Sequence, residues 1–197
     1  MENYVVTISR QFASFGRSIA QKLSEELSVE FYDRDIVEAT AKRMGLPIPV
    51  ISNEEESAYP TFFRRKYPLG MGDANLQDEI FNVQSNIIRD IAQRESCIIV
   101  GRCAGYILRD HPRILNVYVY APVEQRLKNC VEVLQMDFKT AKQMIKEVDK
   151  ARENYRRRYC PGVKTAYDGY DIMIDSSKFG IEGTAKILAD IVRSQFL

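Results

Sequence analysis

A run of polar and basic residues from Ser9 to Ser18 has the composition of a phosphate-binding turn. An apolar run precedes it and an amphipathic helical pattern follows, so the chain is expected to pass there from strand to helix. A phosphate at such a turn meets backbone N–H groups and the positive end of the helix dipole. Gly16 permits close approach of the backbone, and Arg10 and Arg17 can add positive charge. A purely structural turn with Ser14 as helix N-cap is the alternative.

The strict P-loop pattern G-x-x-x-x-G-K-S/T is absent from this turn. Aligned on the predicted helix, its first glycine falls at Arg10, its second at Phe15 and its lysine at Gly16. The hydroxyl position falls at Arg17 or Ser18, which makes Ser18 the candidate contact for Mg²⁺.

A second basic group lies in the predicted helix 138–159. Arg152 and Arg156 are four residues apart and therefore share one helix face. Arginine binds phosphate with a planar charged fork, so such a face can contact an anionic ligand. The alternative is a solvated face on which Glu147, Asp149 and Glu153 pair with these arginines.

The charges of the chain nearly cancel, with 28 Lys and Arg against 27 Asp and Glu and a formal net charge of +1. This balance gives no general attraction to nucleic acid or to an anionic membrane, so local clusters must bind any anion. No apolar run approaches the roughly 20 residues of a membrane span, and the first residues lack the order of a signal peptide. We expect a cytoplasmic protein that has no nucleic-acid or membrane partner and that can form a homo-oligomer.

The cysteines form no C-x-x-C pair, and the single histidine, His111, lacks the spacing of a zinc ligand relative to them. We therefore expect reduced thiols that are mostly packed in the interior, as in other cytosolic proteins. They are Cys97, Cys103, Cys130 and Cys160.

Short apolar runs alternate with helical patterns along the 197 residues. Predicted strands cover residues 4–9, 29–32, 97–100, 115–120 and 170–174, and predicted helices cover 17–27, 34–44, 76–94, 123–136, 138–159 and 181–196. This order predicts a single α/β domain, in which helices cover both faces of a parallel β-sheet. The strands show no clean apolar–polar alternation, as expected of strands covered on both faces. Residues 46–75 hold several prolines and short charge runs, which predict an irregular or partly helical insertion.

Ligands of such sheets bind beyond the carboxyl ends of the strands. This rule selects residues 9–18, 33–35, 101–105 and 121–126. The sequence motifs in these segments and in the helix that follows resemble the cytidylate kinase-like family, a branch of the nucleoside monophosphate kinases within the P-loop kinases. The first loop of that family typically reads S-R-Q-x-G-S-G-G-R, matched here by Ser9, Arg10, Gln11, Ser14, Gly16 and Arg17.

Further family motifs follow in order. The L-x-x-x-F-Y-D-R-D/E stretch is present from Leu27 to Asp35, the strand ending in G-R-x at 100–105, and A-P-x-E-x-R at 121–126. The pattern I-x-x-x-D-x-x-R-x-x-Y is matched by Ile145, Asp149, Arg152 and Tyr155, and residues 170–177 resemble the last strand. The likeness covers nearly the whole chain except residues 46–75.

The resemblance implies an ATP-dependent phosphotransferase that uses Mg²⁺ and acts on a nucleoside monophosphate, cytidylate-like, or on another small acceptor. Donor phosphates would lie on Ser9, Arg10, Gln11, Ser14, Gly16, Arg17 and Ser18. The acceptor's phosphate would lie on Arg34 and Arg102, oriented by Asp33, with residues 46–75 as an acceptor-side subdomain. Residues 145–165 would form a helical lid, and the catalytic residues would be Arg17, Asp149, Arg152 and Arg156.

The first loop departs from the family at Ala13 and Phe15, where glycine is usual. If these positions need a positive φ, each costs about 1–2 kcal/mol, and the Phe15 ring could occupy the space of the nucleotide. The alternative to an active enzyme is therefore a degenerate P-loop protein that binds nucleotide or a protein partner without catalysis. Locally, Arg102 could pair with Asp110, and Asp33 could serve only as a helix N-cap.

Overall fold

The computed structural model of the chain describes residues 2–55 and 74–197. Within these ranges a five-stranded, fully parallel sheet has the strand order β2-β3-β1-β4-β5. The strands are β1 (Val5–Arg10), β2 (Glu30–Tyr32), β3 (Cys97–Val100), β4 (Ile114–Tyr120) and β5 (Ile172–Asp175). Every predicted strand is confirmed, with ends shifted by one or two residues at most.

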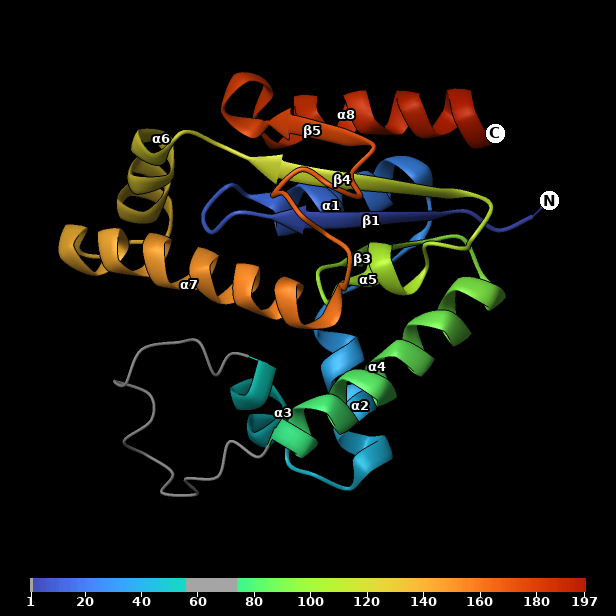
Figure 1. Cartoon of the computed structure of the whole chain (residues 1–197). Helices are drawn as coiled ribbons and strands as arrows, with labels where there is room; N and C mark the ends of the chain where they lie inside the picture. Colours follow the sequence, from blue (N-terminus) through green and yellow to red (C-terminus); the bar gives the residue numbers. More distant parts are fainter. Residues whose placement is uncertain (1, 56–73) are drawn as a thin grey trace.

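Helices cover both faces of this sheet, as predicted (Figure 1). One face carries α1 (Gly16–Leu27) and α8 (Ser176–Phe196), and the other carries α2 (Arg34–Met44), α4 (Ala74–Arg94) and α5 (Ala104–Ile107). On the first face Ile19, Leu23 and Leu188 are fully buried against the strands. On the second face Ile36 and Ile88 pack with β1 and β3. Burial of such apolar side chains is the dominant favourable term in folding.

The segment expected to be irregular or partly helical begins with a helix, α3 (Ile48–Glu55). Its residue Ile51 is buried together with Val37 of α2 and Ile80 of α4, so this helix closes a small apolar cluster beside the main sheet. The rest of the predicted insertion, residues 56–73, lies outside the described residues.

The helix predicted over 123–136 is divided. It begins as α6 (Val123–Lys128) and continues as a π-helical turn (Asn129–Val133), in which the Leu134 N–H bonds the Asn129 carbonyl five residues back. A new helix, α7 (Phe138–Tyr159), has the predicted bounds. The Asp137 carboxylate caps it by accepting from the Thr140 N–H at 2.9 Å. Figure 1 shows β4 leading toward α6 and α7 running back past the sheet.

Strand β4 corrects the expectation that the strands lack alternation. Leu115, Val117 and Val119 are buried, while Asn116 and Tyr118 between them are only half-buried. Neighbouring side chains of a strand point to opposite faces. One face of β4 packs into the core with α1 and α8, and Asn116 and Tyr118 line a cavity on the other face, which explains the polar residues.

Helix α8 begins five residues before the predicted start, but it is kinked at Gly180, whose φ is 66°. The predicted helix from Ile181 therefore corresponds to the part beyond the kink. Among the helices in the two described ranges, none combines the length and the apolar character needed to cross a membrane.

Candidate functional site

The first loop joins β1 to α1 through two residues in the left-handed backbone conformation. The φ angles of Ala13 and Phe15 are 58° and 59°. The concern raised by the sequence is therefore real, because these two positions, where glycine is usual, do need a positive φ. The Phe15 ring is half-buried and packs against the core formed by the sheet, α1 and α8. The Phe15 side chain therefore contributes to the packing of this core.

Ser14 does not cap helix α1. The residue is fully buried, and its hydroxyl donates to the carbonyls of Gln11 at 3.0 Å and Val119 at 3.1 Å. The N-cap position belongs to Phe15, and α1 has no side-chain cap. The first turn of an α-helix has N–H groups without intrahelical partners, so this end of α1 is suited to an anion.

Gly16 has a role different from the one expected. A Cβ there would lie 2.5 Å from the Cβ of Arg10, so the glycine lets the Arg10 side chain cross the start of α1. A Cβ on Gly101, whose φ is 77°, would lie 2.2 Å from Nη1 of Arg10. Both glycines therefore make room for one arginine side chain: Gly16 beside its first carbons, and Gly101, at the end of β3, beside its guanidinium.

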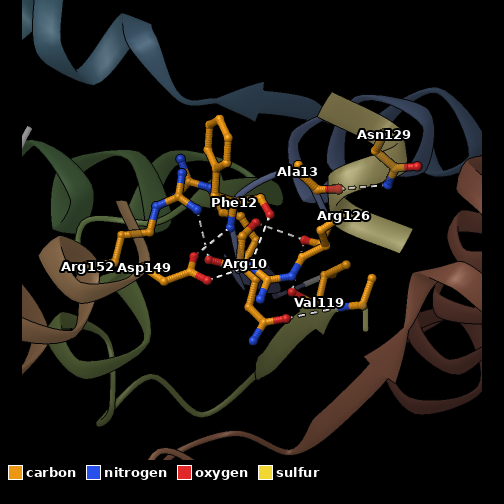
Figure 2. A network of polar contacts seen from close by, with 11 residues as sticks. Arg10, Phe12, Ala13, Val119, Arg126, Asn129, Asp149 and Arg152 are labelled. Atoms are coloured by element: carbon orange, nitrogen blue, oxygen red, sulfur yellow. Dashed lines mark hydrogen bonds and ion pairs between the residues drawn. The ribbon is translucent and has the colours of Figure 1, made fainter. Parts of the chain in front are cut away.

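The first loop is clamped from outside by four side chains of α6, the π-helical turn and α7 (Figure 2). Asp149 Oδ1 accepts from the Phe12 N–H at 2.7 Å, and Oδ2 lies 2.5 Å from Nη1 of Arg126. Asn129 Nδ2 donates to the Ala13 carbonyl at 2.8 Å, and Arg152 Nη1 donates to the Arg10 carbonyl at 3.0 Å. The loop conformation is thus fixed by polar groups from outside the loop.

Two members of this clamp were missed by the sequence reasoning. Arg126 belongs to the quoted A-P-x-E-x-R motif, but no role was predicted for it. The residue is 4% exposed, which indicates that its charged side chain has a structural role. Asn129 carries no motif signal, because it reaches the loop only through the π-helical turn.

Asp33 links the first loop to the end of β3. Its Oδ2 lies 2.7 Å from Nε of Arg17, and its Oδ1 lies 3.2 Å from Nη1 of Arg102. Asp33 occupies the N-cap position of α2, but its side chain makes no capping hydrogen bond and pairs with the two arginines instead. Arg102 does pair with a nearby acid, as the alternative expected, but that acid is Asp33, whereas Asp110 lies 3.8 Å from Arg109.

Three predicted residues lie on the surface. Arg17 points its guanidinium to Asp33 while its side chain remains 54% exposed. Ser18 is exposed in the first turn of α1, and Arg34 is exposed in the first turn of α2. Among the described residues Arg34 forms no ion pair. The structure therefore brings Arg17, Asp33 and Arg102 together but leaves Arg34 outside this contact.

Arg156 holds the segment that follows α7. It donates to the carbonyls of Thr165, Ala166 and Asp168, and its guanidinium lies 4.8 Å from the ring centre of Tyr170. Hydrogen bonds from Thr165 and from the Thr165 and Lys164 N–H groups lower the pKa of Asp168 to about 2.

The alternative of a solvated α7 face is only partly correct. Glu153 pairs with Arg157 at 2.9 Å, but Asp149 pairs with Arg126 rather than with an arginine of its own helix.

A cavity of about 620 Å³ lies between the ends of β1, β3 and β4, helix α5, the second half of α7 and residues 160–170. Its wall carries five arginines and three carboxylates, an excess of positive charge that favours an anionic ligand. The arginines are Arg10, Arg102, Arg109, Arg152 and Arg156, and the carboxylates are Asp149, Glu153 and Asp168.

Tyrosine and amide groups complete the wall of this cavity. Tyr118 lines it and packs against Tyr170, with 4.9 Å between ring centres and an angle of 37° between the ring planes, and burial raises the pKa of Tyr118 to about 12. Its hydroxyl is therefore protonated at neutral pH and can donate to a ligand. Asn116 Oδ1 accepts from Thr7 Oγ1 at 2.7 Å, and a Cβ on Gly105 would lie 2.3 Å from that Asn116 oxygen.

The predicted site residues divide between this wall and its surroundings. Those that line the cavity are Ser9, Arg10, Arg102, Asp149, Arg152 and Arg156. Those that do not are Gln11, Ser14, Gly16, Arg17, Ser18, Asp33 and Arg34. Arg109 was missed; it lines the cavity with its guanidinium 4.6 Å from the ring centre of Tyr106.

A model of the cytidylate kinase-like family matches residues 5–178. None of the curated proteins matches the chain significantly. The structure of an uncharacterized protein from Eubacterium ventriosum is similar at 26% identity and a TM-score of 0.72, covering 98% of this chain and 99% of that chain.

Shikimate kinases share the fold at lower identity. The enzyme from Acinetobacter baumannii, in complex with shikimate, is 16% identical with a TM-score of 0.56, covering 99% of this chain and 96% of that chain. The enzyme from Aquifex aeolicus is 20% identical with a TM-score of 0.53, covering 98% of both chains. These two likenesses support the fold alone.

Proposed function

The chain belongs to the cytidylate kinase-like family, and from this premise we propose that it transfers a phosphoryl group from ATP to a small anionic acceptor bound in the arginine-lined cavity. A nucleoside monophosphate of the cytidylate kind is the first acceptor to test. Family and fold support a kinase-type function on a small molecule. The proposal adds ATP as the phosphoryl donor and the identity of the acceptor.

The observation that carries the proposal is the set of five arginines around a cavity that opens beside the first loop. Phosphoryl transfer needs little covalent help from the protein and depends on positioning and on neutralising charge. Fixed guanidinium groups in a partly enclosed site meet that need better than mobile surface charges. A volume of about 620 Å³ also falls in the usual range of small-molecule sites.

Donor phosphates are assigned to the first loop and the start of α1. The uncapped end of this helix supplies N–H groups, and Arg17 adds a charge that is still half-exposed. Asp33 holds the Arg17 guanidinium in place from one side. The remaining residues assigned here are Ser9, Arg10, Gln11, Ser14, Gly16 and Ser18.

The acceptor's phosphate is assigned to Arg102 at the end of β3, and Arg34, which the resemblance also implied, lies outside the cavity and is left out of this assignment. Asp33 also fixes Arg102, whose side chain is 11% exposed, so one carboxylate sets the spacing between the donor-side and acceptor-side arginines. Such a link suits a reaction in which donor and acceptor must be held in line. Arg109, over the ring of Tyr106, is a further candidate contact.

The proposed lid over residues 145–165 consists of the second part of α7 and the residues that follow it. The Arg152 guanidinium lies between the first loop and the cavity, which suits a group that contacts the transferring phosphoryl. The contacts of Asp149 and Arg156 favour positioning roles, the first on the loop and the second on residues 165–168. This revises the direct catalytic role that the resemblance implied for both.

Mg²⁺ fits this site only if the phosphates share in binding it. In residues 2–55 and 74–197 no group of three or more His, Cys, Asp or Glu side chains is placed to hold a metal. Mg²⁺ commonly takes few protein ligands together with substrate phosphates. The exposed Ser18 hydroxyl is the residue proposed to contact it, and the bound ion would neutralise charge on the donor phosphates.

The test is steady-state ADP release by the full chain with ATP, Mg²⁺ and a panel of acceptors. The panel contains the common ribonucleoside and deoxyribonucleoside monophosphates and shikimate, and a reaction without acceptor measures background hydrolysis. We expect acceptor-dependent ADP release and a phosphorylated product identified by mass spectrometry. Nucleotide binding without acceptor-dependent release across the panel would instead favour a P-loop protein that binds without catalysis.

A further inference from the structure

Two polar side chains meet between β1 and β4, away from the first loop. Thr7 and Asn116 are partners in the strand register, and Thr7 Oγ1 donates to Asn116 Oδ1 at 2.7 Å. Both residues line the cavity. Gly105 of α5 lies directly against the pair, since a Cβ there would be 2.3 Å from Asn116 Oδ1 and 3.2 Å from Thr7 Oγ1. None of the roles proposed above uses these residues.

The pair leaves one polar group of Asn116 for a ligand. Thr7 is 3% exposed, and its hydrogen bond to Asn116 offsets the cost of burying a hydroxyl. Asn116 itself is half-buried, and in the described ranges no group accepts a hydrogen bond from its Nδ2. Because Thr7 and Gly105 hold the oxygen side of the amide, Asn116 offers an NH₂ donor in a fixed orientation.

This donor lies at the end of the cavity remote from the first loop. Thr7 and Arg10 both line the cavity and are three residues apart in β1. A strand advances about 3.3 Å per residue, so their levels along the sheet differ by roughly 10 Å. A ligand whose phosphate lies on Arg102 at the loop end can therefore extend along the strands toward Asn116.

The walls between these two ends are aromatic. Tyr118 lies two residues beyond Asn116 on the same face of β4 and packs against Tyr170. On the side of α5 the cavity is lined by Tyr106, which carries the Arg109 guanidinium over its ring. Aromatic side chains pack well against another flat ring. A phosphate end, aromatic walls and a hydrogen-bond donor at the far end together suit a nucleotide.

We propose that Asn116 determines acceptor specificity by donating from Nδ2 to a carbonyl oxygen on the base of a nucleoside monophosphate, with Thr7 as the positioning residue for its amide. The inference rests on the proposed function, which places the acceptor's phosphate on Arg102. The ligand class is a nucleotide whose base carries a carbonyl oxygen, as cytosine, uracil and guanine do and adenine does not. A site built to hydrogen-bond one group rejects ligands that lack it, because its own polar group then stays unpaired.

The experiment measures equilibrium binding of CMP and AMP to the full chain by calorimetry, which requires no turnover. Asn116→Asp keeps the shape of the side chain and the acceptor for Thr7, but replaces the NH₂ donor by an oxygen. We expect CMP binding to weaken at least tenfold and AMP binding to change less than twofold. Repulsion by the new carboxylate would weaken both equally, since both ligands carry the same phosphate. The matched control is Asn86→Asp, at an exposed position of α4 outside the cavity, and ATP binding checks the fold of each variant.

Two further variants test the positioning role of Thr7 without adding charge. Thr7→Val removes the hydroxyl that holds the amide and is expected to weaken CMP binding about 2- to 10-fold. Thr7→Ser keeps a hydroxyl at this position and should restore CMP binding to the wild-type value. Equal effects of the two substitutions would show that only the packing of Thr7 matters and would remove its positioning role.

The outcomes separate this inference from the proposed function. Equal losses of CMP and AMP binding in Asn116→Asp, unchanged CMP binding in that variant, or a wild type that binds none of CMP, UMP and GMP would overturn the inference. Selective loss of CMP binding in a chain that releases no ADP would leave the specificity site standing and remove the proposed transfer. Acceptor-dependent ADP release that is the same in wild type and Asn116→Asp would do the reverse.

Discussion

The Asp149 carboxylate lies 2.5 Å from the guanidinium of Arg126 and joins α7 to α6 directly beneath the first loop. Arg126 is 4% exposed, and Asp149 also accepts from the Phe12 N–H, so this ion pair supports the loop as well as the helices. A buried arginine without its partner is costly, because its charge has lost both water and the carboxylate.

Asp149→Asn should therefore destabilise the fold. We expect the free energy of unfolding, measured with urea, to fall by about 2–4 kcal/mol. The matched control on the same helix is Glu153→Gln, whose partner Arg157 is 74% exposed, and its change should stay within about 0.5 kcal/mol. Equal losses in the two variants would mean that the Asp149 contact contributes no more than an exposed pair.

Arg152→Ala should lower kcat much more than it raises KM. Its guanidinium faces both the Arg10 carbonyl and the cavity, so its contact with a transferring group would strengthen as charge moves. We expect a loss of about 10²–10³ in kcat in the ADP-release assay. Arg157→Ala, on the exposed face of the same helix, is the control, and an unchanged kcat in Arg152→Ala would remove Arg152 from catalysis.

Arg17→Ala should weaken donor binding. A guanidinium that contacts phosphate contributes about 1.5–3 kcal/mol, which corresponds to a rise in the ATP dissociation constant of about 10- to 150-fold. Calorimetric titration of ATP would measure it. Arg193→Ala removes an arginine paired with Glu26 and Asp190 instead, and should leave ATP binding unchanged.

Position 15 should favour glycine over alanine. Phe15→Gly and Phe15→Ala both lose the packing of the ring, so their difference reports mainly on the backbone, whose φ is 59°. We expect the glycine variant to unfold with a free energy about 1 kcal/mol larger than the alanine variant. In a helix interior, where φ is negative, alanine is more stabilising than glycine. An alanine variant as stable as the glycine variant would therefore contradict the left-handed conformation at position 15.

The Asp168 carboxyl should titrate near pH 2, because its pKa is lowered to about 2 by the Thr165 and Lys164 hydrogen bonds. The folded pKa lies below the unfolded value of about 4, so the stabilisation is complete above pH 4 and is lost as the pH falls toward 2. Carboxyl carbon shifts in a pH titration would measure it. A midpoint near 4 would show that these hydrogen bonds are absent in solution.

Much of the fold follows from local patterns. The helices 34–44 and 138–159 and the strand 97–100 were predicted at their observed ends, because caps, periodicity and apolar runs act over a few neighbouring residues. The α-helix predicted over 123–136 ends at Lys128 in the structure and continues as a π-helical turn, which leaves no clear periodic pattern in the sequence. The polar residues of β4 are explained only by the tertiary structure, because they line the cavity on that face of the strand.

The sequence by itself determined the residue types of this protein's site: an arginine-rich turn after the first strand, arginines at strand ends and on one helix, and the family that shares this order. Only the tertiary structure decided their partners. Asp33 joins Arg17 to Arg102, and Asp149 joins Arg126 to the loop. Charged groups act over a few ångströms, and which of them come that close depends on how distant elements pack rather than on spacing along the chain.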